Sequence, residues 1–235
     1  MSKPKRAPLR PRRDALEGLG DRIGQSLKKG MSKLEELIAD SRKSGDENAA
    51  CDARLLDYVK VLIDGKNIGS VAPSSKYLVE RMAKAADLES ARVVVEYGPA
   101  TGVITRRLLH KMRPDARLIA VEYNETFLAE LTARVKDPRF TAVHGDVREI
   151  DRVLAPLGVT RADRVVSGVP FALFSGHERR AILTKTSTLL VPGGRFVAFG
   201  YTTHLIPMLK DHFSSFDIQF EVRNLPPSFV FTARK

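Results

Sequence analysis

Apolar residues follow two alternating spacings from about residue 91 to the end of the chain. Short runs rich in β-branched residues are typical of buried strands, and longer segments repeat an apolar residue every three or four positions, as on one helix face. The pattern predicts strands at 92–96, 118–122, 140–143, 163–167, 194–200, 217–223 and 228–233. It predicts helices near 102–112, 124–136, 147–155, 176–190 and 203–213. Alternating strands and helices predict an α/β fold, a mostly parallel sheet covered on both faces. Only residues 224–227 join the last two strands, which must therefore form an antiparallel hairpin.

The N-terminal part has a different organisation. Apolar residues at steps of three and four predict an amphipathic helix over 14–43, and a second helix is expected near 49–63. Four glycines in the first helix each lower its helicity by about 1 kcal/mol relative to alanine. This helix therefore needs an external apolar surface, and the protein's own core, a partner helix and a lipid interface all qualify. We divide the chain into a basic tail (1–13), a helical extension that includes a lid and a cofactor-contacting loop (14–90), and an α/β domain (91–235).

Positive charge is concentrated at the N-terminus. The chain has a net charge of +11, and residues 1–13 contain six Lys and Arg and no acid, so they carry +6 of it. Such a tail attracts polyanions, of which nucleic acid and an anionic membrane are both candidates, although a merely solubilising tail has the same composition. No signal-peptide or membrane-spanning pattern is found, and the single cysteine, Cys51, offers neither a disulfide nor a metal cluster. We expect a cytoplasmic protein without a metal site.

The first predicted strand of the α/β domain carries the clearest chemical signal. Its β-branched run ends at Glu96, and a loop with Gly98 and Gly102 follows before a helix. Strand, glycine loop and helix together bring backbone N–H groups and a helix N-terminus close to a ligand. Ala100 occupies the position of the second glycine in the dinucleotide-binding pattern. The spacing E-x-G-x-x-x-G resembles motif I of the class I S-adenosylmethionine-dependent methyltransferases.

Acidic residues also end or follow the next two strands. Glu122 can accept both hydroxyls of a ribose, and Asp146 can accept a hydrogen bond from the exocyclic amine of adenine. Taken singly, each of the three acids is better explained as a surface charge or a helix cap. Together, at three successive strand ends, they favour S-adenosylmethionine as the cofactor, with S-adenosylhomocysteine as the product. The predicted cofactor-binding residues are Ser75, Glu96, Tyr97, Gly98, Pro99, Ala100, Thr101, Gly102, Glu122, Tyr123, Gly145, Asp146, Val147 and Ser167.

Over about residues 60–235 the chain resembles the bacterial phospholipid N-methyltransferases, whose core is also similar to that of the rRNA adenine dimethylases. The motifs that carry the resemblance are 68–75 (IGSVAPSS), 96–102 (EYGPATG), 167–170 (SGVP) and 223–227 (RNLPP). Tyr97 and Ala100 depart from it, because leucine and glycine are usual at these positions. The resemblance implies a seven-stranded class I methyltransferase fold and stepwise methylation of phosphatidylethanolamine towards phosphatidylcholine. It also implies peripheral association with the inner face of the cell membrane, for which residues 1–43 are the predicted contact.

The residues after strands four and five are expected to form the acceptor side of the site. Gly168, Val169 and Pro170 are expected to present the acceptor. Tyr201 and His204 are candidates to orient the amine or take its proton, and a rim tyrosine and a surface histidine are the competing interpretations. Arg180 or Arg223 can hold a lipid phosphodiester, or either can be a solvated charge.

Two other functions fit parts of the pattern. An rRNA or tRNA adenine N6-methyltransferase would use Pro170 and Phe171 to hold a flipped base, but Ser167 replaces the amide or acid that such enzymes use. A degenerate methyltransferase fold that acts only as a binding module is the third hypothesis, and the intact acids at the strand ends disfavour it.

Overall fold

The computed structural model describes residues 74–171, 174–200, 203, 205–224 and 227–235. Its strands are β1 (Val93–Tyr97), β2 (Arg117–Glu122), β3 (Phe140–His144), β4 (Ala162–Ser167), β5 (Leu190–Gly200), β6 (Ser215–Glu221) and β7 (Ser228–Arg234). Its α-helices are α3 (Lys76–Ala86), α4 (Val103–Lys111), α5 (Glu125–Arg134), α6 (Ile150–Leu154), α7 (Gly176–Leu189) and α8 (Leu205–His212). Three short 3-10 turns complete the described elements: η1 (Leu88–Ser90), η2 (Val147–Glu149) and η3 (Ala155–Leu157). The predicted tail at 1–13 and the helices predicted at 14–43 and 49–63 lie outside the described residues.

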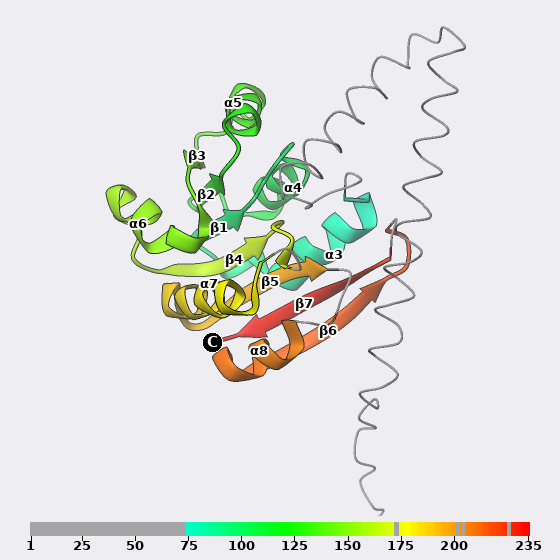
Figure 1. Cartoon of the computed structure of the whole chain (residues 1–235). Coiled ribbons are helices and arrows are strands. Elements are labelled where there is room, and N and C mark those ends of the chain that lie inside the picture. Colours follow the sequence, from blue (N-terminus) through cyan, green and yellow to red (C-terminus); the bar gives the residue numbers. More distant parts are fainter. Residues whose placement is uncertain (1–73, 172–173, 201–202, 204, 225–226) are drawn as a thin grey trace, which may run out of the picture.

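The strands form one seven-stranded sheet in the order β3-β2-β1-β4-β5-β7-β6 (Figure 1). Strands β1 to β5 are parallel, and β7 runs antiparallel to both β5 and β6. The predicted fold class is confirmed, including the C-terminal hairpin. This is the topology of the class I methyltransferases.

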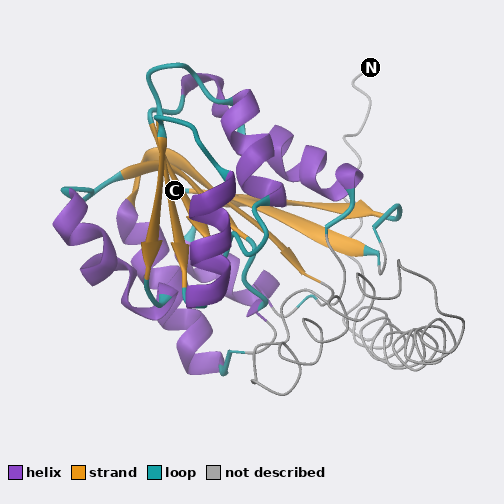
Figure 2. Cartoon of the chain, turned by 90° about the horizontal axis from the view of Figure 1, so that it is seen from above, coloured by secondary structure: helices purple, strands orange, loops and turns teal. Residues whose placement is uncertain are grey.

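Both faces of the sheet are covered by helices (Figure 2). Val94 packs with residues of α3 and α4, whereas the next residue, Val95, packs with residues of α6, α7 and α8. Side chains alternate between the two faces of a strand, so a strand buried on both sides needs apolar residues at consecutive positions. The β-branched run of β1 meets this need.

Some predicted boundaries were wrong. Strand β5 begins at Leu190 instead of 194, because the strand continues through Pro192-Gly193-Gly194 with a register shift against β4. Strand β6 spans Ser215–Glu221 instead of 217–223, since Val222 and Arg223 already form the hairpin turn. The helix predicted at 147–155 is three short pieces, η2, α6 and η3.

Helix α3 is attached to the body of the domain at both ends. At its start, Ser75 donates its backbone N–H to Asn224 Oδ1 at 2.9 Å, and Asn224 in turn donates to Ser228 Oγ at 2.9 Å. At its end, the buried Arg164 of β4 donates from Nε to the carbonyls of Ala86 (2.6 Å) and Asp87 (3.0 Å). A buried guanidinium is stable only when its donors are used, and here it caps the C-terminus of the helix.

The carboxyl ends of the parallel strands and the β6–β7 hairpin share one edge of the sheet. Because β7 is antiparallel to β5, its second residue, Phe229, lies opposite the last residue of β5, Gly200. Ser228 likewise lies opposite Glu221 at the end of β6. In open α/β sheets the ligand binds beyond the carboxyl ends of the strands. This edge is therefore where the functional site is expected.

Candidate active site

The loop after β1 is held in a conformation that requires glycine. Gly98 has φ +63°, and its N–H donates to Val121 O at 2.9 Å. A Cβ on Gly98 would stand 2.7 Å from Val169 Cγ1, so the neighbouring loop leaves no room for one. Gly102, with φ +76°, begins α4, and a Cβ there would stand 2.5 Å from Leu131 Cδ1. The loop thus presents bare backbone at the N-terminus of α4, a geometry suited to a charged or nucleotide-like ligand.

Ala100 shares the left-handed backbone of these glycines, although it carries a side chain. Its φ is +47°, a region that costs an L-residue roughly 1–2 kcal/mol. Its N–H donates to Glu122 Oε2 at 3.0 Å, and this bond joins the β1 loop to the end of β2. Pro99 and Thr101 contribute carbonyls to the same loop, accepting from Gly102 N (2.9 Å) and Arg106 Nη1 (3.1 Å). The bonds fix the loop as one unit.

Glu96 is fully buried at the end of β1, and neither carboxylate oxygen has a hydrogen-bond partner among the described residues. Burial raises the pKa of Glu96 to about 8, and the Glu122 carboxylate adds to the shift. The nearby Thr105 hydroxyl and Arg106 guanidinium lower the pKa of Glu96, but neither forms a hydrogen bond of good geometry with its carboxyl group. A buried unpaired carboxyl group is costly unless a ligand satisfies it. S-adenosylmethionine fits this need, because it carries an ammonium group and N–H donors.

Glu122, at the end of β2, is nearly buried and anchored by backbone donors. Oε2 accepts from Ala100 N, and Oε1 accepts from Asn124 N at 2.9 Å. Burial raises its pKa, although these N–H bonds act in the opposite direction. The Tyr123 N–H also stabilises the ionised form, and since a carboxylate has about four acceptor sites, one is left for a ribose hydroxyl. Glu122 lies beside the glycine loop, and its contact with the ribose stays a prediction.

Asp146 has a local structural role at the end of β3. Its Oδ1 accepts from the backbone N–H of Arg148 at 2.8 Å and caps η2, while its Oδ2 accepts from Arg148 Nε at 2.8 Å. Burial alone would raise the pKa of Asp146, but the hydrogen bonds from Arg148 outweigh it and lower the pKa. Arg148 also donates to Glu178 of α7 at 2.8 Å. Contact with adenine stays a prediction for an acid that already serves as a cap and an ion-pair partner.

Two glycines hold the loops after β3 and β4 close to the site. Gly145 donates its N–H to Glu122 O at 3.0 Å, and a Cβ there would meet Val153 Cγ2 at 2.6 Å. Gly168 donates to Tyr97 O at 2.7 Å, and a Cβ there would stand 2.5 Å from Gly98 O. The predicted acceptor segment therefore lies directly against the glycine loop.

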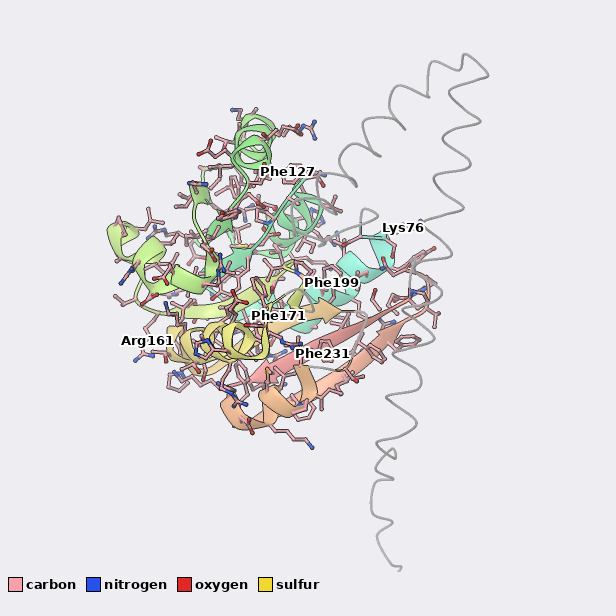
Figure 3. The ribbon with its side chains drawn as sticks, viewed as in Figure 1. Lys76, Phe127, Arg161, Phe171, Phe199 and Phe231 are labelled. Carbon is pink, nitrogen blue, oxygen red and sulfur yellow. The ribbon has the colours of Figure 1, made fainter. Side chains whose placement is uncertain are left out.

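The residues around Gly168 divide between the site edge and the core. Ser167 is fully buried, and its Oγ has no hydrogen-bond partner among the described residues. Val169 packs on Gly98, and Pro170 is half-buried next to it. Phe171 is buried against Phe174 and Phe196, with ring centroids 6.1 and 5.9 Å away (Figure 3).

Three other predicted cofactor residues have side chains that lie in the core or at the rim of the site. The Tyr97 ring is fully buried on the opposite face of β1, and its hydroxyl lies 3.2 Å from Thr186 Oγ1 of α7. Burial raises the pKa of this phenol. Only the Tyr97 backbone faces the loops, and Val147 is likewise part of the core. Tyr123 is exposed and its ring lies 6.4 Å from that of His144, so it lies at the rim.

The hydroxyl of Ser75 caps α3, accepting from Leu78 N at 3.2 Å, and its backbone is fixed by Asn224. The Ser75 hydroxyl is thus used as a helix cap, and its contact with the cofactor stays a prediction. Arg180 lies 3.0 Å from Asp211 and thereby joins α7 to α8. Tyr201 and His204 lie outside the described residues.

Arg223 is held by a buried acid that the sequence did not indicate. Glu221, at the end of β6, accepts from Arg223 Nε at 2.9 Å and from Arg81 Nε of α3 at 2.9 Å. Hydrogen bonds from Arg223 are the largest influence on Glu221 and lower its pKa to about 2. Arg81 and Glu221 are 140 positions apart, so no local pattern could reveal the pair. Among the described residues no group of three or more His, Cys, Asp and Glu is arranged to hold a metal.

Comparisons with known proteins identify the family and the fold. A family model described as "Methyltransferase domain" matches residues 94–194. An ornithine lipid N-methyltransferase from Singulisphaera acidiphila is 34% identical over 72% of this chain and 90% of its own length. A dimethyladenosine transferase from Schizosaccharomyces pombe is 31% identical over 55% of this chain, but only 40% of that protein is covered. The solved structure of the O-methyltransferase TomG from Streptomyces achromogenes, in complex with S-adenosylmethionine, shares the fold, with a TM-score of 0.57. The two sequences are 15% identical, and the superposition covers 77% of this chain and 89% of TomG.

Proposed function

Since the chain belongs to the family of S-adenosylmethionine-dependent methyltransferases that includes ornithine lipid N-methyltransferase, we propose that it methylates the amine of a membrane lipid headgroup, with phosphatidylethanolamine as acceptor. The observation that carries this proposal is that the similarity extends over 90% of the lipid enzyme. The dimethyladenosine transferase is matched over 40% of its length. The matched part of the chain therefore accounts for nearly all of a lipid enzyme and less than half of an RNA enzyme.

The surroundings of Phe171 also favour a lipid acceptor over a nucleic acid base. An adenine N6 enzyme needs an aromatic side chain that can stack on a flipped base. In this chain the candidate ring is buried between Phe174 and Phe196. A base could reach it only after the core had been opened.

The residues of the site support methyl transfer by positioning and by exclusion of water. S-adenosylmethionine, when bound, supplies an activated methyl group. Glu96 and Glu122 are suited to hold its polar groups, and the closely packed Gly98 and Gly168 bring the acceptor segment against it. Correct placement of two reactants accounts for much of the rate in such transfers.

The acceptor amine must lose a proton before it can react. A primary alkylammonium has a pKa of about 10.4 in water, and an apolar surrounding favours its neutral form. We assign the orientation of the amine and the removal of its proton to Tyr201 and His204, which follow β5 in the sequence. Arg223 is proposed to meet the lipid phosphodiester with the donors that Glu221 leaves free.

A transfer assay with several acceptors tests the proposal. The full-length protein is incubated with methyl-labelled S-adenosylmethionine and, separately, with phosphatidylethanolamine, ornithine lipid, phosphatidylglycerol and total RNA. We expect label in phosphatidylethanolamine and none in phosphatidylglycerol, which has no amine. Label in ornithine lipid alone would correct the headgroup, whereas label confined to RNA would overturn the proposal. Glu122→Gln is the control variant with impaired cofactor binding, and it should transfer less label to every acceptor that the parent protein methylates.

A further inference from the structure

Exposed apolar side chains gather at the end of the β6–β7 hairpin. Four large hydrophobic residues are exposed among those that the structure describes, and three of them lie there: Tyr77 (38%), Phe220 (43%) and Val222 (65%). Phe220 and Val222 belong to β6 and its turn, and Tyr77 is in the first turn of α3. We call these three residues, with Lys76 and Arg223, the hairpin-end surface. A concentration of exposed apolar groups at one place on a folded domain marks an interaction site.

The hairpin-end surface is built on a rigid support. The Arg223 guanidinium lies over the Tyr77 ring at 4.0 Å from its centroid, which joins the hairpin turn to α3. Glu221 accepts hydrogen bonds from both Arg223 and Arg81 and is almost fully buried beneath them. On the other side of β6, the Phe220 ring lies 4.9 Å from that of Phe229.

Apolar groups occur on both sides of the hairpin because side chains alternate along β6. Glu221 faces α3, so its strand neighbour Phe220 points to the opposite side of the sheet, Tyr77 lies on the α3 side, and the exposed Val222 follows in the turn. The hairpin end is therefore a wedge with an apolar group on either side. Such a shape is better suited to insertion into the interfacial layer of a membrane than to contact with one flat protein surface.

The charges around the wedge are positive. Lys76, Arg81 and Arg223 contribute three cations beside the carboxylate of Glu221. The adjoining groove adds three further cations and two acids (Lys84, Arg195, Arg234, Glu80 and Asp217), so six cations stand against three acids, a local balance of +3. Glu221 is buried, whereas Lys76 and Arg223 are exposed. Figure 3 shows Lys76 at the outer start of α3. Aromatic and aliphatic tips surrounded by Lys and Arg are typical of elements that bind an anionic membrane interface.

The position of this surface connects it to the candidate site. Phe229 lies opposite Gly200, the last residue of β5, and the proposed catalytic residues follow Gly200. The hairpin end and the loops after β1 and β4 thus occupy the same edge of the sheet (Figure 1). A surface that contacts the hairpin end also meets the edge where the acceptor arrives.

We propose that the hairpin-end surface docks on an anionic phospholipid surface and presents the carboxyl edge of the sheet to the lipid headgroups. The proposal builds on the proposed lipid acceptor, and it assigns membrane contact to folded residues of the α/β domain. Val222, the most exposed large apolar side chain in the part of the chain that the structure describes, enters the interface, while Lys76 and Arg223 contact lipid phosphates.

A tryptophan reporter tests docking without any methyl transfer. The chain contains no tryptophan, so Val222→Trp introduces a single fluorophore at the hairpin end. Thr160→Trp, at an exposed position before the start of β4 and thus at the opposite edge, is the matched control. Vesicles of phosphatidylglycerol and phosphatidylcholine contain no acceptor amine. We expect a blue shift and quenching by brominated acyl chains for Val222→Trp alone. Equal responses at the two positions, or no response at 222, would overturn the proposal.

A second variant separates docking from catalysis. Val222→Asp should weaken partition of the full-length protein onto the same vesicles about tenfold, because it places a charge where an apolar group enters the interface. Thr160→Asp adds the same charge elsewhere and should leave partition unchanged. Methyl transfer to phosphatidylethanolamine dispersed in detergent should be the same for both variants and the parent. Unchanged partition of Val222→Asp would overturn docking, whereas loss of transfer by the parent protein in detergent would count against the proposed function instead.

Discussion

The backbone N–H of Ala100 donates to Glu122 Oε2 at 3.0 Å, and Ala100 holds a φ of +47° to do so. The link between the glycine loop and the end of β2 therefore depends on an alanine in a backbone conformation that glycine adopts freely. The sequence resemblance gives glycine as the usual residue at this position, and in this chain the link is made at a cost in stability.

Replacing Ala100 by glycine should stabilise the protein. Relief of the left-handed strain outweighs the larger entropy of glycine in the unfolded chain, and we expect the free energy of unfolding to rise by up to about 1 kcal/mol. Urea denaturation measures it. Ala129→Gly, on the exposed side of α5, is the control and should lose about 1 kcal/mol. Equal losses for both variants would show that Ala100 is not strained.

Glu122→Gln should weaken binding of S-adenosylhomocysteine about tenfold or more. The amide keeps the shape of the side chain, but it loses the charge and one acceptor oxygen, and a hydrogen bond to a charged group contributes about 1.5–3 kcal/mol. Isothermal titration calorimetry measures the affinity. Glu125→Gln, in the exposed first turn of α5, removes the same charge three positions later. If both variants bind equally well, Glu122 does not contact the ligand.

The stability of the ligand-free protein should depend on Glu96 in one pH window. Burial raises the pKa of Glu96 from 4.5 to about 8, so the carboxyl group ionises in the unfolded chain first as the pH rises. The unfolded state then binds fewer protons, and this contribution to the free energy of unfolding decreases between about pH 4.5 and about pH 8. Glu96→Gln removes the titration. The stability of the variant minus that of the parent, from urea titrations, should increase across this window; a constant difference would contradict the raised pKa.

Binding of S-adenosylhomocysteine should release a proton from Glu96. At pH 7 the free protein holds Glu96 protonated, because its pKa is about 8, and pairing with the ammonium group of S-adenosylhomocysteine favours the carboxylate. We expect close to one proton per ligand, measured as the dependence of calorimetric binding heat on buffer ionisation enthalpy. Glu96→Gln should release fewer. Equal release from parent and variant would assign the proton to another group.

Gly168→Ala should damage the contact between the two loops. A Cβ at this position would stand 2.5 Å from Gly98 O, and backbone on both sides must shift to admit it. We expect a loss of about 1–3 kcal/mol in the free energy of unfolding and weaker cofactor binding. Gly176→Ala is the control, since a Cβ there meets nothing within 4 Å. Thermal denaturation with and without S-adenosylhomocysteine compares the two, and equal melting temperatures would refute the close packing.

The sequence predicted the sheet and the acids of the site for one physical reason. Buried parallel strands need continuous apolar runs, and the residue that ends such a run must lie at the ligand-binding edge. Glu96 and Glu122 follow directly from this rule. For Tyr97, motif spacing indicates the loop position of its backbone, whereas the alternation along β1 turns its ring to Thr186 and the core, so its contact with the cofactor stays a prediction for the backbone alone.

Other features depend on contacts that local patterns do not contain. Asp146 is both a strand-end acid and the cap of η2, and only the position of Arg148 distinguishes the two roles. The pairing of Arg81 with Glu221 joins the first described helix to the last hairpin. It arises because β7 inserts between β5 and β6, and this order places the end of β6 beside α3.

The two attachments of α3 have a mechanical consequence. Arg164 fixes the end of the helix to the middle of the sheet, and Asn224 fixes its start to the hairpin. Ser75 and the first turn of α3 are thereby held at the carboxyl edge of the sheet, close to the Arg223 guanidinium that lies over Tyr77. A displacement of the hairpin would therefore move the start of α3, whereas Arg164 would keep the end of the helix in place.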